Sequence, residues 1–180
     1  MNFKKTNAVL GLITIFLMTA HAVYQMFAYI TFYYNPLVSK LTGFILLGVV
    51  VLHVILSMLI VFTKTDSVTV TYKRRNIRTV IQRVSAMMMV ILLPVHVFEF
   101  ELLKRNAGSA VKYLIELTLI LFYDALMLHI SMSFSNALIT LGLLEDMKKK
   151  KIIDTVVLII SIAIFTAASV ITLSVQLKMF

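Results

Sequence analysis

Five long, mostly apolar stretches dominate this sequence. They cover residues 8–33, 41–62, 79–103, 112–143 and 152–177 approximately. An α-helix rises ~1.5 Å per residue, so about 20 residues cross a hydrocarbon core ~30 Å thick, and each stretch is long enough to span a membrane. Backbone polar groups must be satisfied internally in lipid, which favours helices. The sequence therefore predicts an all-α protein: an integral membrane bundle of five transmembrane helices, in a single domain over residues 1–180.

The composition agrees with this class and excludes others. Hydrophobic residues make up 61% of the chain and the mean hydropathy is +0.99, whereas a soluble domain is about 45–50% apolar. The net charge of +9 comes from basic residues beside the apolar stretches, so we expect contact with membrane lipid and no nucleic acid. Because the chain has no cysteine, thiolate ligation of iron–sulfur clusters and covalent c-type haem attachment are excluded.

The basic residues predict an orientation. Those near residues 4–5, 64–78 and 148–151 would lie on one side, and fewer would lie on the other, at Lys40, 104–105, Lys112 and Lys178. The positive-inside rule then puts the N-terminus in the cytoplasm and the C-terminus outside. We expect a bacterial-type cytoplasmic membrane.

The histidines follow a pattern that points to function. The chain has four, and each lies in a different apolar stretch: His21, His53, His96 and His129. A single histidine in a membrane helix is often a packing residue, but four on four helices with none in a loop indicate a functional set, because ionisable groups are costly in lipid. Neutral imidazole is a good axial ligand of haem iron.

The depth of each histidine predicts how they pair. Counted from the cytoplasmic helix ends, His21 and His96 lie further outward than His53 and His129. The hypothesis is two b-type haems, one held between each pair. Small polar or basic side chains near the histidines are candidate partners for the haem propionates, namely Arg83, Ser85, Ser57 and Ser133. For Arg83, an interfacial arginine that reaches for the headgroups is an equal alternative.

Acidic residues supply candidates for proton transfer to a quinone. Glu99 shares a helix face with His96, about one turn outward, and Glu116 lies toward the same side of the membrane. Solvated interfacial glutamates are the alternative. Asp124 lies deep inside the fourth stretch, where a carboxylate is usually protonated, paired or functional. The sequence does not decide its role.

Two motifs resemble a known family. The first runs Gln82-Arg83-Val84-Ser85-Ala86 and is followed by His96-Val97; the second runs from His129-Ile130-Ser131 through Asn136-Ala137-Leu138 to Leu141-Gly142-Leu143. The chain resembles the diheme cytochrome b membrane anchor of succinate dehydrogenase and fumarate reductase, of the five-helix single-subunit type. Ala86 departs from the family's glycine at that position.

This resemblance implies a role in electron transfer. The four histidines would be the axial ligands, and the haems would carry electrons between a membrane quinone and flavoprotein and iron–sulfur subunits at the cytoplasmic face. Such a subunit belongs to an oxidoreductase complex but does not act on the dicarboxylate by itself.

Other classes of membrane protein remain open. The chain could be the b-type anchor of another oxidoreductase, or a haem-free small transporter or scaffold subunit. Against a transporter, we expect no inverted repeat and no paired broken helices. No helix carries two histidines as in ferric-reductase-type proteins.

Overall fold

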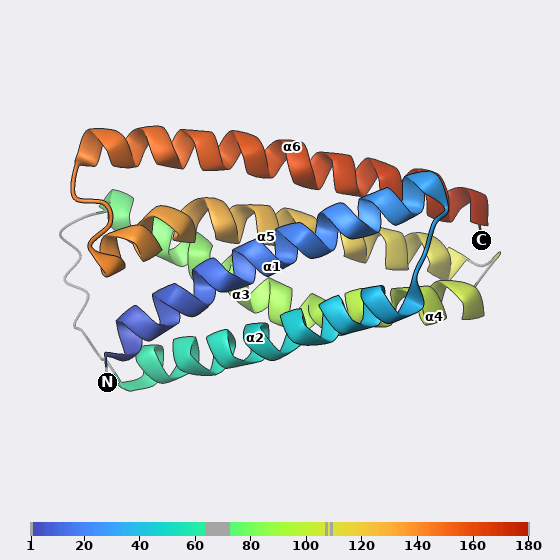
Figure 1. Cartoon of the computed structure of the whole chain (residues 1–180), viewed down its shortest axis with the longest axis horizontal. Helices are drawn as coiled ribbons and strands as arrows, with labels where there is room; N and C mark the ends of the chain where they lie inside the picture. The colour runs from blue at the N-terminus through green and yellow to red at the C-terminus, as the bar shows by residue number, and fades with distance from the viewer. Residues whose placement is uncertain (1, 64–72, 107, 109, 180) are drawn as a thin grey trace. The chain divides into compact units, whose positions relative to one another are not determined.

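The computed structural model describes residues 2–63, 73–106, 108 and 110–179. Within these ranges every regular element is an α-helix (Figure 1). The expected all-α fold class is confirmed. Lys64, one of the basic residues that contribute to the predicted orientation, falls in 64–72, outside the described residues.

Within the described ranges, six helices follow one another. They are α1 (Phe3–Thr31), α2 (Pro36–Thr63), α3 (Lys73–Val97), α4 (Glu99–Arg105), α5 (Ala110–Leu141) and α6 (Met147–Met179). Five of them are long and apolar enough to cross a membrane, all except α4. The chain is therefore a multi-pass transmembrane protein.

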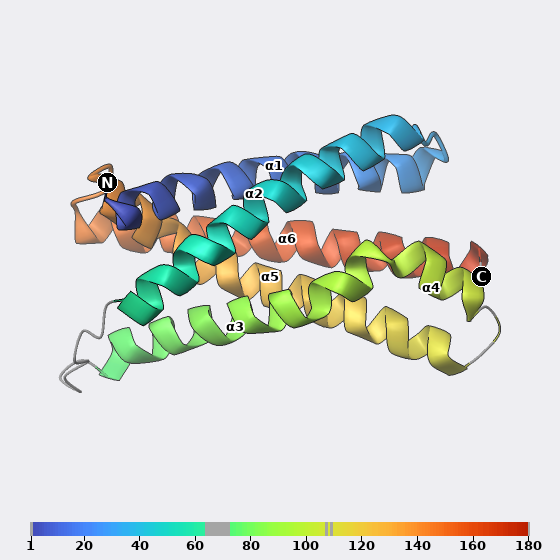
Figure 2. The same cartoon turned by 90° about the horizontal axis from the view of Figure 1, so that it is seen from below.

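The third apolar stretch, predicted as one membrane span over approximately 79–103, is divided between two helices, α3 and α4. Phe98, at φ −102° and ψ 10°, separates α3 from α4. Pro94 has no N–H to donate and its ring crowds the carbonyl one turn earlier, which weakens this part of the helix. Hydrogen bonds from Phe98 N to Pro94 O (3.1 Å) and from Leu102 N to Phe98 O (3.0 Å) still bridge the break. Figure 2 shows α4 leaving α3 at an angle.

The chain divides into two compact units. The first contains residues 1–73 and 133–155, and the second contains 74–132 and 156–180. Consequently α5 and α6 each contribute one part to either unit. Each unit is described by itself below.

In the first unit, α1 and α2 form an antiparallel pair. They lie side by side in both whole-chain views (Figures 1 and 2). Phe32 ends α1 in the left-handed conformation, at φ 57°. Asn35 then caps α2, because its Oδ1 accepts hydrogen bonds from the backbone N–H groups of Leu37 (3.0 Å) and Val38 (3.3 Å). Pro36 occupies the first helical position, where its missing N–H is not needed. Asn35-Pro36 thus forms a capped helix start.

The second unit has its apolar core where α3, α4 and α5 meet. Leu103, Ile115 and Leu119 form the buried cluster, and Val95 and Leu102 pack against it. Arg78 joins α3 to α5: its Nε donates to Met132 O at 3.1 Å and its Nη2 to Ser131 O at 3.2 Å. A cationic side chain that binds helix carbonyls is satisfied without leaving the protein.

Candidate functional site

The four histidines divide equally between the units. His21 and His53 belong to the first unit, His96 and His129 to the second. All four are partly buried. Each expected haem pair, His21 with His96 and His53 with His129, takes one residue from either unit, and the pairing stays a prediction. The surroundings of each ring within its own unit are defined.

The two histidines of the first unit each lie against a glycine of the opposite helix. A Cβ added to Gly11 of α1 would be 3.2 Å from Cε1 of His53, and one added to Gly43 of α2 would be 3.7 Å from Cε1 of His21. Glycine lets the helix backbone approach a ring closely. The α1–α2 interface therefore has two positions of the same kind, at which a histidine ring packs on a glycine. We call them the imidazole seats.

Polar pairs flank these seats. Asn7 and Ser57 exchange two hydrogen bonds, from Asn7 Nδ2 to Ser57 Oγ (3.0 Å) and from Ser57 Oγ to Asn7 Oδ1 (3.2 Å). At the other end, Gln25 Nε2 donates to Ser39 Oγ at 2.7 Å. Ser57 is a predicted partner of a haem propionate. In this structure its hydroxyl instead donates to and accepts from the Asn7 side chain.

These contacts reveal an internal repeat. The order polar, glycine, histidine, polar occurs at Asn7, Gly11, His21 and Gln25, and recurs with the same spacing at Ser39, Gly43, His53 and Ser57. Because α1 and α2 are antiparallel, the two copies are inverted with respect to each other. The expectation that the chain has no inverted repeat is therefore wrong for these two helices.

His21 and His53 differ in their hydrogen bonding. His21 Nδ1 lies 3.5 Å from Thr42 Oγ1, and that hydroxyl already donates to Val38 O at 2.8 Å. With its proton on Val38 O, the Thr42 oxygen can accept from Nδ1 of His21, an arrangement that leaves the lone pair of the neutral ring on Nε2. His53 instead interacts with the backbone of Asn7. Its Nδ1 is buried and has no hydrogen-bond partner among the described residues.

In the second unit, His96 lies in a cluster of aromatic and polar side chains. Its Nδ1 is 3.1 Å from Oε2 of Glu99, the first residue of α4. Its ring stacks on Phe122 with centroids 4.8 Å apart and meets Tyr123 edge-on at 6.0 Å. Tyr123 in turn forms a side-chain hydrogen bond with Thr172 of α6. The break at Phe98 leaves Glu99 within reach of His96, one turn away as the sequence suggests.

The sequence did not single out Phe122, Tyr123 or Thr172. Phe122 and Tyr123 contact His96 from another helix, at positions that have no fixed spacing from it in the sequence. The one available signal was the pair of aromatic residues next to Asp124 in a run of aliphatic side chains.

His129 is held by the backbone of α3. Its Nδ1 lies 3.1 Å from Gln82 O. Since a carbonyl can only accept, the His129 proton is on Nδ1 and the lone pair on Nε2. The same carbonyl also accepts a hydrogen bond from Ser85 Oγ at 3.1 Å. Ser85, a predicted contact of the haem, is 2% exposed and bonds its own helix.

The remaining predicted residues lie in varied surroundings. Arg83 is exposed and Ser133 is partly buried. Glu116 is 4% exposed, and its Oε1 has no hydrogen-bond partner in the described part of the chain. Lys112, one turn earlier on α5, is 6% exposed. A buried carboxylate oxygen without a partner costs about 1–3 kcal/mol or more, so Glu116 is a second polar position of interest.

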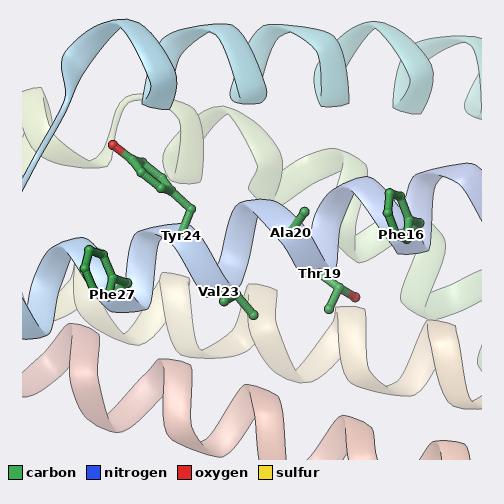
Figure 3. A pocket seen from close by; sticks show the side chains of 6 residues that line it. All are labelled: Phe16, Thr19, Ala20, Val23, Tyr24 and Phe27. Atoms are coloured by element: carbon green, nitrogen blue, oxygen red, sulfur yellow. The ribbon is translucent and has the colours of Figure 1, made fainter.

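An open apolar groove runs along α1 (Figure 3). Its lining side chains all come from this helix: Phe16, Thr19, Ala20, Val23, Tyr24 and Phe27. Tyr24 also closes the α1–α2 turn, since its hydroxyl donates to Asn35 O at 3.1 Å. An apolar groove with aromatic edges suits a flat hydrophobic group or a lipid chain. One of the lining residues, Ala20, directly precedes His21 in the sequence.

The described residues contain no group of three or more His, Asp or Glu side chains that could hold a bare metal ion. A haem with two histidine ligands takes only two imidazoles to its iron, so such a site does not need a group of three. Comparison with protein-family models, curated proteins and solved structures finds no match.

Proposed function

We propose that this protein is a diheme cytochrome b membrane subunit. It carries electrons through two b-type haems between a membrane quinone and a soluble redox partner. The observation that carries the proposal is the state of the histidines. Four membrane-length helices hold one each, and the Nδ1 atoms of His21, His96 and His129 lie 3.5, 3.1 and 3.1 Å from an oxygen atom that can accept a hydrogen bond.

This hydrogen bonding is suited to haem ligation. A histidine that binds a metal through Nε2 typically donates its Nδ1–H to a carboxylate, a carbonyl or a similar acceptor, which fixes the ring and raises its basicity. Glu99 supplies a carboxylate to His96 (3.1 Å), and Gln82 supplies a carbonyl to His129 (3.1 Å). His53 departs from this pattern, because its buried Nδ1 has no hydrogen-bond partner among the described residues.

The proposed roles follow from these positions. His21 and His96 would hold one haem, and His53 and His129 the other. Bound haem iron supplies one-electron chemistry at a potential that its ligands and surroundings set. This chain's residues would orient the imidazoles, and Arg83 and Ser133 are the predicted propionate partners that are at least partly exposed. Ser57 and Ser85, the other two predicted partners, would first have to leave their present hydrogen bonds to Asn7 and Gln82.

Quinone reduction or oxidation also needs a group that exchanges protons. Glu99 and Glu116 are the proposed groups, because both are acidic residues in the second unit and Glu116 is buried with an oxygen that lacks a partner. Glu99 belongs to the cluster of side chains around His96. Tyr123, which contacts His96 and hydrogen-bonds to Thr172, belongs to the same cluster.

The resemblance to succinate dehydrogenase and fumarate reductase anchors supports the choice of partners. Flavoprotein and iron–sulfur subunits would dock on the cytoplasmic side of a bacterial-type cytoplasmic membrane, with the N-terminus inside and the C-terminus outside. The basic end of α5–α6, around 148–151, would lie at this face.

The test is a dithionite-reduced minus oxidised spectrum, with pyridine haemochrome quantification, on protein purified from haem-supplied membranes. We expect two b haems per chain. Single substitutions of His21, His53, His96 and His129 by alanine should each remove one haem, and double substitutions within a predicted pair should still remove only one. A well-folded preparation without haem overturns the proposal.

A haem-free transporter is the second candidate. The inverted repeat of α1 and α2 favours it, since transporter sites often lie between inverted repeats. It predicts no haem absorbance and a glycine–histidine interface that binds the transported solute.

A further inference from the structure

One face of α5 is exposed and regularly patterned. Leu114, Leu117, Leu121, Asp124 and Leu128 follow one another at alternating spacings of three and four residues. The four leucines are 62%, 53%, 41% and 38% exposed, respectively, and Asp124 is exposed as well. This is the spacing of the contact positions in a two-stranded coiled coil. We call this set the α5 seam; all of it belongs to the second unit.

Asp124 lies inside the hydrocarbon wherever the membrane crosses α5. The helix runs from Ala110 to Leu141, and a span of about 20 residues crosses the core. Every window of that length within α5 contains Asp124. A carboxyl group without a partner inside a transmembrane helix carries a large free-energy cost.

The rest of the described chain does not relieve this cost. Asp124 makes no hydrogen bond or ion pair with any described residue. Leucines can face lipid without penalty, but the carboxyl group cannot. Exposed polar groups in transmembrane helices are usually satisfied by a neighbouring helix. The seam therefore has the features of a helix-packing surface whose polar position needs a partner.

We propose that the α5 seam binds the same seam of a second copy of this chain, with the two Asp124 carboxyl groups hydrogen-bonded to each other. The seam is self-complementary: leucines meet leucines, and a neutral carboxyl group can donate to and accept from an identical one. An isologous contact of this kind generates a closed, two-fold symmetric dimer.

Membrane insertion favours this occupant. Copies of one chain insert with the same orientation, so their α5 helices are parallel and equal residues lie at equal depth. Asp124 then faces Asp124 without any adjustment of register. A single polar side chain in an otherwise leucine-rich seam is also the feature that fixes register and pairing in two-stranded coiled coils.

The absence of cysteine makes the test clean. Single variants Leu117→Cys, Leu121→Cys and Leu128→Cys are oxidised in membrane vesicles, with Ile91→Cys, on an exposed position of α3, as the control. We expect disulfide-linked dimers of twice the chain mass from the three seam positions and not from the control. The full chain is used throughout, and haem content is irrelevant to the readout.

The role of the carboxyl group is tested by energy transfer between labelled chains as they are diluted in bilayers. Asp124→Ala should weaken association about three- to thirty-fold, the range that an interhelical hydrogen bond contributes. Asp124→Asn keeps a donor and an acceptor and should restore most of it. A far-UV spectrum and the haem spectrum check that each variant is folded.

Three results would overturn the proposal. The first is equal cross-linking at seam and control positions, which indicates random collision. The second is association that Asp124→Ala leaves unchanged. The third is a cross-linked product whose mass requires a different polypeptide, because the seam then serves a hetero-partner.

Discussion

His53 of α2 packs on Gly11 of α1 so closely that a methyl group at Gly11 would lie 3.2 Å from the ring. The matching contact, His21 on Gly43, leaves 3.7 Å. The two seats are equivalent in sequence pattern but not in tightness. The difference between these two distances can be tested with a matched pair of glycine-to-alanine substitutions.

Gly11→Ala should disturb the His53 seat, and Gly43→Ala should be tolerated. The first added methyl is closer than ordinary van der Waals contact, whereas the second is within it. Overpacking costs about 1–3 kcal/mol. We expect a lower midpoint of thermal unfolding in detergent for Gly11→Ala, with loss of one haem signal if the proposed function holds. Equal behaviour of the two variants would contradict the asymmetry.

Removal of Glu99 should loosen His96. Glu99→Gln keeps the size of the side chain but removes the carboxylate that accepts from Nδ1 at 3.1 Å. Partners of this kind are worth about 10–100-fold in metal affinity. We expect weaker haem retention at the His96 site and a higher reduction potential for that haem, measured by redox titration.

Glu101→Gln is the matched control for Glu99→Gln. Glu101 lies on the same short helix and pairs with exposed Arg105 at 3.0 Å, away from any histidine. It should leave both haem signals intact. If Glu99→Gln also does so, the carboxylate has no part in positioning His96.

Asn7 and Ser57 should be energetically coupled. Their two hydrogen bonds (3.0 and 3.2 Å) tie the start of α1 to the end of α2. Interhelical hydrogen bonds in membranes average about 0.6 kcal/mol and reach about 1.7. A double-mutant cycle with Asn7→Ala and Ser57→Ala, read from unfolding free energies, should give a coupling in this range. Strictly additive effects would exclude a direct interaction.

In the first unit, the junction of α5 and α6 contains a largely buried ion pair between Lys150 and Asp154. Asp154 accepts hydrogen bonds from Ser135 Oγ (2.5 Å) and Lys150 Nζ (2.8 Å). The Lys150 and Asp154 side chains are 15% and 23% exposed. Asp154→Ala removes the carboxylate partner of a largely buried ammonium group and leaves it Ser135 Oγ, at 3.3 Å, as a hydrogen-bond acceptor. We expect a loss of stability of about 1–3 kcal/mol.

The surface pair Arg105–Glu101, whose side chains are 73% and 57% exposed, is the reference for Asp154→Ala. Exposed pairs contribute about 0–1 kcal/mol. Glu101→Ala should therefore change the unfolding midpoint little. A larger effect of Glu101→Ala than of Asp154→Ala would contradict the burial argument.

Hydropathy was enough to predict the helical class and the five membrane-length helices, because lipid leaves the backbone few alternatives. The break at Phe98 was not predicted, although Pro94 was visible. A proline weakens a helix but does not determine the residue at which the helix ends. Here the break lies at Phe98, four residues after Pro94, and the Phe98 N–H still donates to Pro94 O.

The site was partly predictable. The closeness of Glu99 to His96 follows from helical spacing, so the sequence contains it. The contacts of His96 with Phe122 and Tyr123, and of His53 with Gly11, depend on how two helices are aligned along their length. That alignment is a tertiary property. The repeated spacing in α1 and α2 contained the information, but it becomes visible only when the helices are read as an antiparallel pair.

The repeat has a consequence for how the two ends of the α1–α2 pair can differ. Each copy of the pattern lies on one helix. Because α1 and α2 are antiparallel, the second copy runs in the opposite direction to the first. His21 and His53 therefore lie toward opposite ends of the α1–α2 pair, each against a glycine of the other helix. Any directionality between them, in potential or in access to protons, must come from what is not duplicated: the hydroxyl of Thr42, the buried Nδ1 of His53, and the voltage and pH difference across the membrane itself.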